Sequence, residues 1–158
     1  MHVYYVFVEN DWELVFRAQS NNSLSPYAAW MGTLSLPTPV QLELNRGGSR
    51  VVYVRFDGRG STFTNWFGID KLIDSGWSTM SKSRTFNYFS IHGTAERRFF
   101  INQNYGSCPV DAGWMAVIDT TSVYGPCEWD IKTKKRPAFL FAPTEDVTQW
   151  QNYGNLIG

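Results

Sequence analysis

Two cysteines, Cys108 and Cys127, mark the part of this 158-residue sequence that offers the most chemistry. Their separation permits one disulfide bond, and the alternative is a pair of buried free thiols. They do not form a C-x-x-C pair, so neither a zinc site nor thioredoxin-like redox chemistry is expected. A disulfide would tie together the loops at both ends of the segment and make them a rigid platform for a binding site.

The loops between residues 104 and 130 combine acidic, amide and aromatic side chains. Carboxylates and amides form paired hydrogen bonds with neighbouring hydroxyl groups of a hexose, and an aromatic ring packs on the apolar C–H face of the sugar. This mixture therefore predicts a carbohydrate-binding site. The alternative is that the acids and amides only stabilise turns and that Trp114 belongs to the core. The residues predicted to contact the sugar are Asn104, Tyr105, Asp111, Glu128 and Trp129.

Clustered acidic side chains also suit calcium, whose ligands in proteins are oxygen atoms. Asp119 and Asp130 are the candidate metal ligands, and a supporting role behind the sugar contacts is the alternative for both. The sequence contains no EF-hand loop. The sequence therefore identifies no definite cofactor, and calcium is the one ion that these acidic residues suggest.

The sequence carries no recognisable catalytic arrangement. It has only two histidines, His2 and His92, and lacks the G-x-S-x-G and H-E-x-x-H motifs, a P-loop and a dinucleotide-binding glycine pattern. A glycosidase needs only two carboxylates, and any pair among the 14 acids could be imagined in that role. We therefore expect a binding protein without enzymatic activity.

Charge and hydropathy exclude two classes of partner. The 14 basic and 14 acidic residues balance, and no basic stripe of the kind that nucleic acids or anionic membranes require is present. No stretch approaches the about 18 apolar residues of a membrane-spanning helix, so no membrane insertion is expected. The pair Arg97–Arg98 is expected to lie at the surface, with pairing to acids or contact with a ligand as alternatives.

Alternating apolar and polar residues predict many short strands. The clearest pair, Val40–Leu44 and Val51–Phe56, flanks Asn45-Arg46-Gly47-Gly48, which is a strong hairpin signal. Residues 25–30 and 66–73 have features of short helices. The sequence therefore predicts one all-β domain over residues 1–158, an antiparallel two-sheet sandwich or partly closed barrel with one or two short helices. The other strands are expected at Val3–Val8, Trp12–Ala18, Phe86–Ile91, Arg98–Ile101, Trp114–Asp119 and Ala138–Phe141.

The cysteine-centred residues resemble a known family. The run Asn104-Tyr105-Gly106-x-Cys108-x-x-Asp111-x-Gly113-Trp114, followed by Cys127-x-Trp129-Asp130, is similar to a lectin-like domain common in secreted proteins of marine invertebrates. Weaker matches are Trp12–Ala18, Asn65-Trp66-Phe67 and Trp150-x-x-Tyr153-Gly154, so the resemblance covers about residues 12–158. Members of the family usually have glutamate at the position of Asp130, which keeps the charge and extends the reach.

Small members of this family resemble galactose-type lectins, among them a feather-star lectin for N-acetyllactosamine. The resemblance implies a secreted protein that binds glycans with terminal galactose or N-acetyllactosamine and that has its two cysteines bonded. Useful cross-linking of glycans needs at least two sites, so a homo-oligomer is expected. The alternative function is an extracellular matrix or adhesion protein that binds other proteins.

Overall fold

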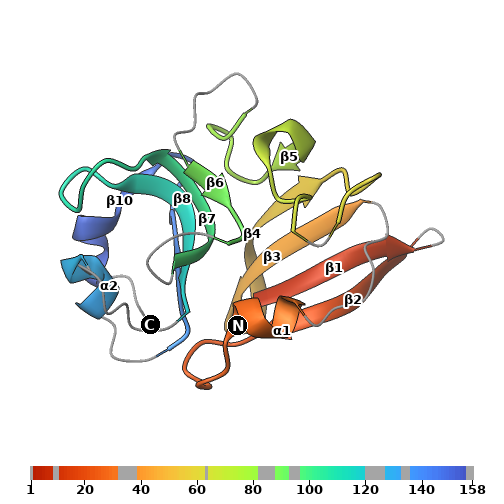
Figure 1. Cartoon of the computed structure of the whole chain (residues 1–158), viewed down its shortest axis with the longest axis horizontal. Helices are drawn as coiled ribbons and strands as arrows, with labels where there is room; N and C mark the ends of the chain where they lie inside the picture. Colours follow the sequence, from red (N-terminus) through yellow and green to blue (C-terminus); the bar gives the residue numbers. More distant parts are fainter. Residues whose placement is uncertain are drawn as a thin grey trace.

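Two antiparallel sheets packed on each other form the body of the protein (Figure 1). The structure, a computed structural model, describes residues 2–8, 11–31, 39–62, 64–81, 88–92, 97–119, 127–132 and 136–155. Sheet A has the strand order β2-β1-β3-β4-β5, and sheet B has the order β10-β8-β7-β6, with β9 also paired to β8. The predicted all-β class and the sandwich architecture are thereby confirmed.

Eight strands coincide at least in part with the strands predicted from the sequence, whereas β5 and β10 were not predicted, and Phe86 and Asn87 of the predicted strand Phe86–Ile91 lie outside the described residues. Sheet A consists of β1 (His2–Val8), β2 (Asp11–Ala18), β3 (Val40–Arg46), β4 (Ser49–Phe56) and β5 (Leu72–Ser75). Sheet B consists of β6 (Tyr88–Ser90), β7 (Arg97–Asn104), β8 (Ala112–Ile118), β9 (Ala138–Phe141) and β10 (Thr148–Gln149).

The hairpin between β3 and β4 shows which residues of sheet A face the core and which face outward. Gly47 and Gly48 at its turn have φ values of 58° and 85°, which glycine adopts without steric cost. Along β3, alternate residues from Val40 to Leu44 point into the sandwich and are buried. Gln41 and Glu43 therefore point to the opposite, outer face of sheet A.

An aromatic core fills the space between the two sheets. Trp66 is fully buried there, and its ring lies 5.4 Å from that of Trp30 and 5.1 Å from that of Phe56. Trp30 comes from helix α1 (Pro26–Met31), which confirms the helix predicted over residues 25–30. Ser25 begins this helix as expected, because its Oγ accepts a hydrogen bond from the backbone N–H of Ala28.

A second apolar cluster covers the outer face of sheet B. It joins Phe100 on β7 and Leu140 on β9 to Trp129 and Trp150. These tryptophans come from helix α2 (Glu128–Lys132) and the 3₁₀ helix η2 (Trp150–Asn155), which lie beyond sheet B at the left of Figure 1. Sheet B is thus buried on both faces, which is consistent with the burial of all seven residues of β8.

The helix predicted over residues 66–73 is wrong. Only Ile69–Lys71 forms a 3₁₀ turn, η1, and Leu72 already begins β5. Trp66 and Phe67 enter the core from an irregular segment, where burial of the aromatic rings and not helical periodicity decides the conformation. None of the helices in the described part of the chain has the length and apolar character needed to cross a membrane.

Gly113 on β8 allows β7 to approach closely, because glycine has no Cβ atom. We therefore expect Gly113→Ala to lower the free energy of unfolding by about 2–3 kcal/mol. A Cβ atom at this position would lie well inside 3.0 Å of the Asn102 side-chain oxygen and the Ile101 carbonyl oxygen. Urea denaturation measures the change. Gly106→Ala is the control, because its nearest neighbour would be Val110 Cγ2 at 3.8 Å. Equal losses in both variants would contradict the prediction.

Candidate functional site

The disulfide that the family resemblance implies is present between Cys108 and Cys127. Their Cα atoms are 5.3 Å apart, and the bond joins the loop after β7 to the start of α2. Cys127 is buried in the cluster on the outer face of sheet B, whereas Cys108 is partly exposed. The bond therefore fixes the layer that covers sheet B.

A buried arginine lies directly beneath this disulfide. The Arg97 guanidinium donates hydrogen bonds from Nε and Nη2 to the two carboxylate oxygens of Asp130, at 3.0 and 2.5 Å. It also donates to Tyr105 Oη at 2.9 Å and lies 3.7 Å from Asp111 Oδ2. The aromatic ring of Trp129 is centred 4.3 Å from the guanidinium carbon. Arg97 is 3% exposed, so the predicted surface position of this arginine is wrong.

The backbone of Phe99 explains why Arg97 points into this layer. Phe99 has a φ of 45°, which is rare for a residue with a Cβ atom, and the pairing of β7 with β8 shifts register between Arg98 and Ile101. In a regular strand the side chains of Arg97 and Phe99 would share one face. Here Phe99 packs between the sheets while Arg97 faces α2.

Five predicted sugar contacts divide into covered and accessible groups. Asp111 and Trp129 are each 2% exposed and belong to the surroundings of Arg97, so a ligand has no access to them in this structure. Tyr105 is partly buried, with its hydroxyl bound to Arg97. Asn104 and Glu128 are exposed. The structure thus unites Tyr105, Asp111 and Trp129 around a cation and not around an open cavity.

The two candidate metal ligands lie in separate contacts. Asp130 is paired with Arg97, whereas Asp119 accepts a hydrogen bond of 2.6 Å from Ser25 Oγ at the start of α1. Within the described residues no group of three or more histidine, cysteine, aspartate or glutamate side chains is arranged to hold a metal ion.

Burial and charge pairing act in opposite directions on the ionisable groups around Arg97. On its own, burial would lower the pKa of Arg97, but the hydrogen bonds to Asp130 and the charges of Asp130 and Asp111 outweigh it and raise this pKa above its usual value. For Asp111 burial is the largest influence and raises the pKa of the carboxyl, against the opposing effect of Arg97 and of the Gly106 N–H. Ionised Asp111 is therefore a cost to the folded state at neutral pH.

We expect Asp111→Asn to become more favourable relative to the wild type as the pH rises. Because the folded-state pKa of Asp111 is raised, its contribution to stability is fully present below the unfolded value of 3.8 and is lost as the pH rises through the folded value. Asparagine has no such titration. Chemical denaturation of both proteins between pH 3 and pH 7 checks this, and a difference that is constant or changes in the opposite direction would contradict it.

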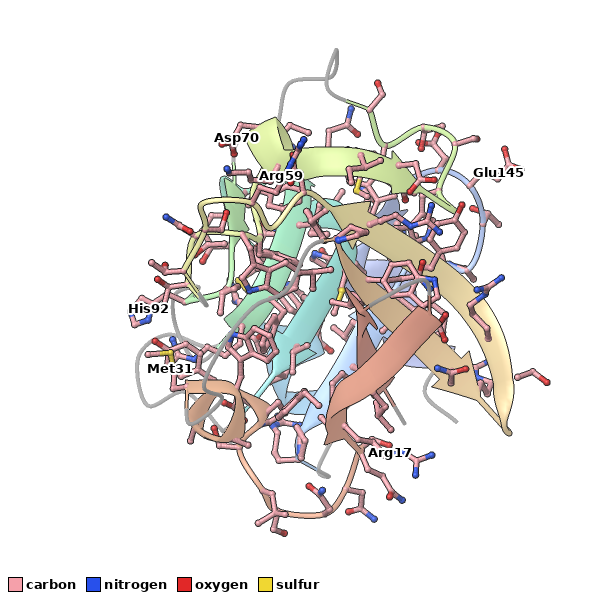
Figure 2. All side chains as sticks on the ribbon, turned by 90° about the vertical axis from the view of Figure 1, so that its right-hand side faces the viewer. Arg17, Met31, Arg59, Asp70, His92 and Glu145 are labelled. Atoms are coloured by element: carbon pink, nitrogen blue, oxygen red, sulfur yellow. A yellow bond between two sulfur atoms is a disulfide. The ribbon has the colours of Figure 1, made fainter. Side chains whose placement is uncertain are left out.

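A different candidate site emerges on the outer face of sheet A. All seven tryptophans of the chain are described, and six are buried, so Trp12 on β2 is the one that is partly exposed. Beside it lies a cavity of about 200 Å³. Figure 2 shows sheet A in front of sheet B, with Arg17 near the end of β2 labelled in the lower part of the view. Among the residues whose side chains the structure describes, those that line the cavity are Trp12, Gln41, Glu43, Arg50 and Arg55.

Strand pairing brings the lining residues together. Gln41 on β3 pairs with Arg55 on β4, and Glu43 pairs with Tyr53, so their side chains share the outer face. The guanidinium carbon of Arg55 lies 5.4 Å from the centre of the Trp12 ring and 5.5 Å from that of Tyr53. This arginine of β4 therefore reaches the tryptophan of the edge strand β2.

One buried amide organises the polar groups of the cavity. Gln41 is 3% exposed, and its Oε1 accepts hydrogen bonds from Arg55 Nε and Nη2 at 3.2 and 2.9 Å. Its Nε2 donates to Glu43 Oε1 at 2.7 Å, and the same oxygen accepts from Arg50 Nη1 at 3.1 Å. The cavity thus presents an aromatic ring, a carboxylate and two guanidinium groups in fixed positions.

Sequence reasoning missed this cavity. It recognised the β3–β4 hairpin by its alternation but assigned no role to the residues of its outer face. The signal available was the type of these residues, because glutamine, glutamate and arginine at alternate positions of one hairpin are bound to meet on one face.

Comparison of the chain with family models, with curated proteins and with solved structures finds no match. The resemblance to marine-invertebrate lectin-like domains therefore rests on the motif residues alone.

Proposed function

We propose that the protein is a carbohydrate-binding protein without enzymatic activity, and that its sugar-binding surface is the outer face of sheet A. The observation that carries the proposal is the cavity beside Trp12, the partly exposed tryptophan of the chain. An aromatic ring next to Glu43, Arg50 and Arg55 offers both an apolar platform and directed hydrogen-bonding groups. Sugars need this combination, because their rings carry an apolar C–H face and hydroxyl groups.

The ligand class that we propose is glycans with terminal galactose or N-acetyllactosamine, on the strength of the family resemblance. Secretion belongs to the same proposal, because disulfides such as Cys108–Cys127 persist in oxidising compartments. Assembly into a homo-oligomer would supply the several sites that cross-linking requires.

A glycan array probed with the purified protein, with and without a calcium chelator, tests the proposal. We expect selective binding to galactose-terminated glycans in both conditions, because the cavity beside Trp12 provides guanidinium donors in place of a metal ion. Loss of binding on chelation would instead assign the acids to metal ligation. Absence of binding to every glycan in both conditions would contradict a carbohydrate-binding function.

A second candidate function is adhesion to another protein, and one observation favours it. Tryptophan, tyrosine and arginine dominate the energetic centres of protein interfaces, and the outer face of sheet A combines Trp12, Tyr53 and Arg55 with Leu14, which is 46% exposed. Free lactose separates the two functions, since it should displace the protein from a glycan-bearing surface and leave a protein-mediated attachment unchanged.

A further inference from the structure

We propose that the cavity beside Trp12 accommodates a single uncharged sugar ring and recognises it through two neighbouring hydroxyl groups. This inference rests on the proposed function and specifies its ligand. Its first support is size. The cavity volume of about 200 Å³ falls below the range of about 300–1,000 Å³ that is typical of pockets for drug-sized molecules. One ring is therefore the fitting occupant, and further rings of a glycan would extend into solvent.

The second support is the pattern of hydrogen-bonding atoms. Glu43 Oε1 accepts hydrogen bonds from Gln41 Nε2 and Arg50 Nη1. Glu43 Oε2 makes no hydrogen bond within the described residues. The Arg50 side chain is 54% exposed and retains N–H groups beyond the one that bonds Glu43. An acceptor and a donor thus lie side by side. They match two adjacent hydroxyl groups, one of which donates to Glu43 while the other accepts from Arg50.

The third support is charge. Arg50 is paired with Glu43 at 3.1 Å, and Arg55 is paired with Asp74 at 3.4 Å. Within the described lining, both guanidinium groups, those of Arg50 and Arg55, are therefore already paired with a carboxylate. A sulfate or carboxylate on the ligand would find no unpaired cation in this described lining and would lie against the Glu43 carboxylate, so an uncharged ring is favoured over an acidic one.

Gln41 gives the site its rigidity. Because its amide bonds Arg55 through Oε1 and Glu43 through Nε2, it fixes two of the lining side chains before a ligand arrives. Such preorganisation reduces the entropic cost of binding. Gln41 is thus a positioning residue, and it has no need to touch the ligand.

Isothermal titration with methyl β-galactoside, lactose and the mono-O-methyl derivatives of the galactoside tests the inference. We expect the simple galactoside to bind within about tenfold of lactose, because one ring supplies the contacts. For two adjacent hydroxyl groups, methylation of either one should weaken binding at least about tenfold, because each methyl group removes a hydrogen bond to a charged side chain. Galacturonic acid should bind more weakly than the uncharged glycoside.

Three results would overturn the inference while leaving carbohydrate binding intact. They are a preference for lactose above about a hundredfold, tolerance of methylation at every hydroxyl, and tighter binding of galacturonic acid. A blank glycan array would contradict the proposed function itself, so the two failures are distinguishable.

A matched pair of variants tests whether the ligand binds on sheet A or at the disulfide-linked loops. Glu43→Gln should weaken galactoside binding at least about tenfold, whereas Glu128→Gln, which changes an exposed carboxylate in the loops first predicted to hold the sugar, should leave it unchanged. The reverse result would move the site to the disulfide-linked loops. Circular dichroism and a denaturation curve of each variant exclude misfolding as the cause.

Discussion

Replacing Arg97 with methionine is expected to lower the free energy of unfolding by about 3–5 kcal/mol. The variant would leave Asp130 and Asp111 buried beneath the disulfide without their cation. A buried carboxylate without a partner destabilises the fold by its full desolvation cost. Methionine replaces only the volume of the arginine side chain and not its charge. Equilibrium unfolding in urea, followed by tryptophan fluorescence, measures the loss.

Arg98→Met is the matched control for this prediction. Arg98 is the next residue in the chain, is partly exposed, and lies 4.5 Å from the centre of the Tyr27 ring, a contact worth about 0.5–1 kcal/mol. Equal losses in the two variants would show that burial of the ion pair does not set the effect. The double variant Arg97→Met with Asp130→Leu should recover part of the loss, because it removes the orphaned charge as well.

Replacing Trp12 with alanine is expected to weaken galactoside binding at least about 30-fold, as for an aromatic residue at the centre of an interface. The variant removes the apolar platform of the cavity and also the ring over which Arg55 is held. Stability should change by only about 1 kcal/mol, since Trp12 is partly exposed on an edge strand. Titration with methyl β-galactoside and urea denaturation measure the two effects.

Leu14→Ala on the same strand distinguishes a sugar platform from a protein interface. Leu14 is 46% exposed and does not line the cavity, so its truncation should change galactoside binding less than about threefold. A flat protein-binding face would lose affinity with both variants. Retention of full galactoside affinity by Trp12→Ala would contradict the assignment of the site to sheet A.

The fold could be predicted from the sequence because local patterns and tertiary structure agree in most strands. The alternation in residues 40–44 and 51–56, with Gly47 and Gly48 between them, defined the β3–β4 hairpin correctly. The segment around Trp66 could not be predicted in this way. The rings of Trp66 and Phe67 pack into the core, and this packing determines the backbone conformation of the chain between β4 and β5.

The site was harder to predict, because residue type carries no information about burial. Asp111, Trp129 and Asp130 have the right chemistry for a sugar or an ion, yet the positive φ of Phe99 brings Arg97 among them and satisfies these acids internally. No local pattern indicated this change of face within β7. Conversely, Trp12 lies on the edge strand β2 and is partly exposed, whereas the other six tryptophans are buried.

The arrangement of β8 has a consequence for how the molecule opens. This strand is bonded to β7 on one side and to β9 and β10 on the other, and its seven residues are all buried. Its amide protons should exchange with deuterium only through global unfolding, while those of the edge strand β2 exchange through local fraying. Conformational rigidity is thus concentrated in the half of the molecule that carries the disulfide. The outer face of sheet A, where we propose that the sugar binds, can therefore accumulate mutations and change its binding preference at little risk to folding.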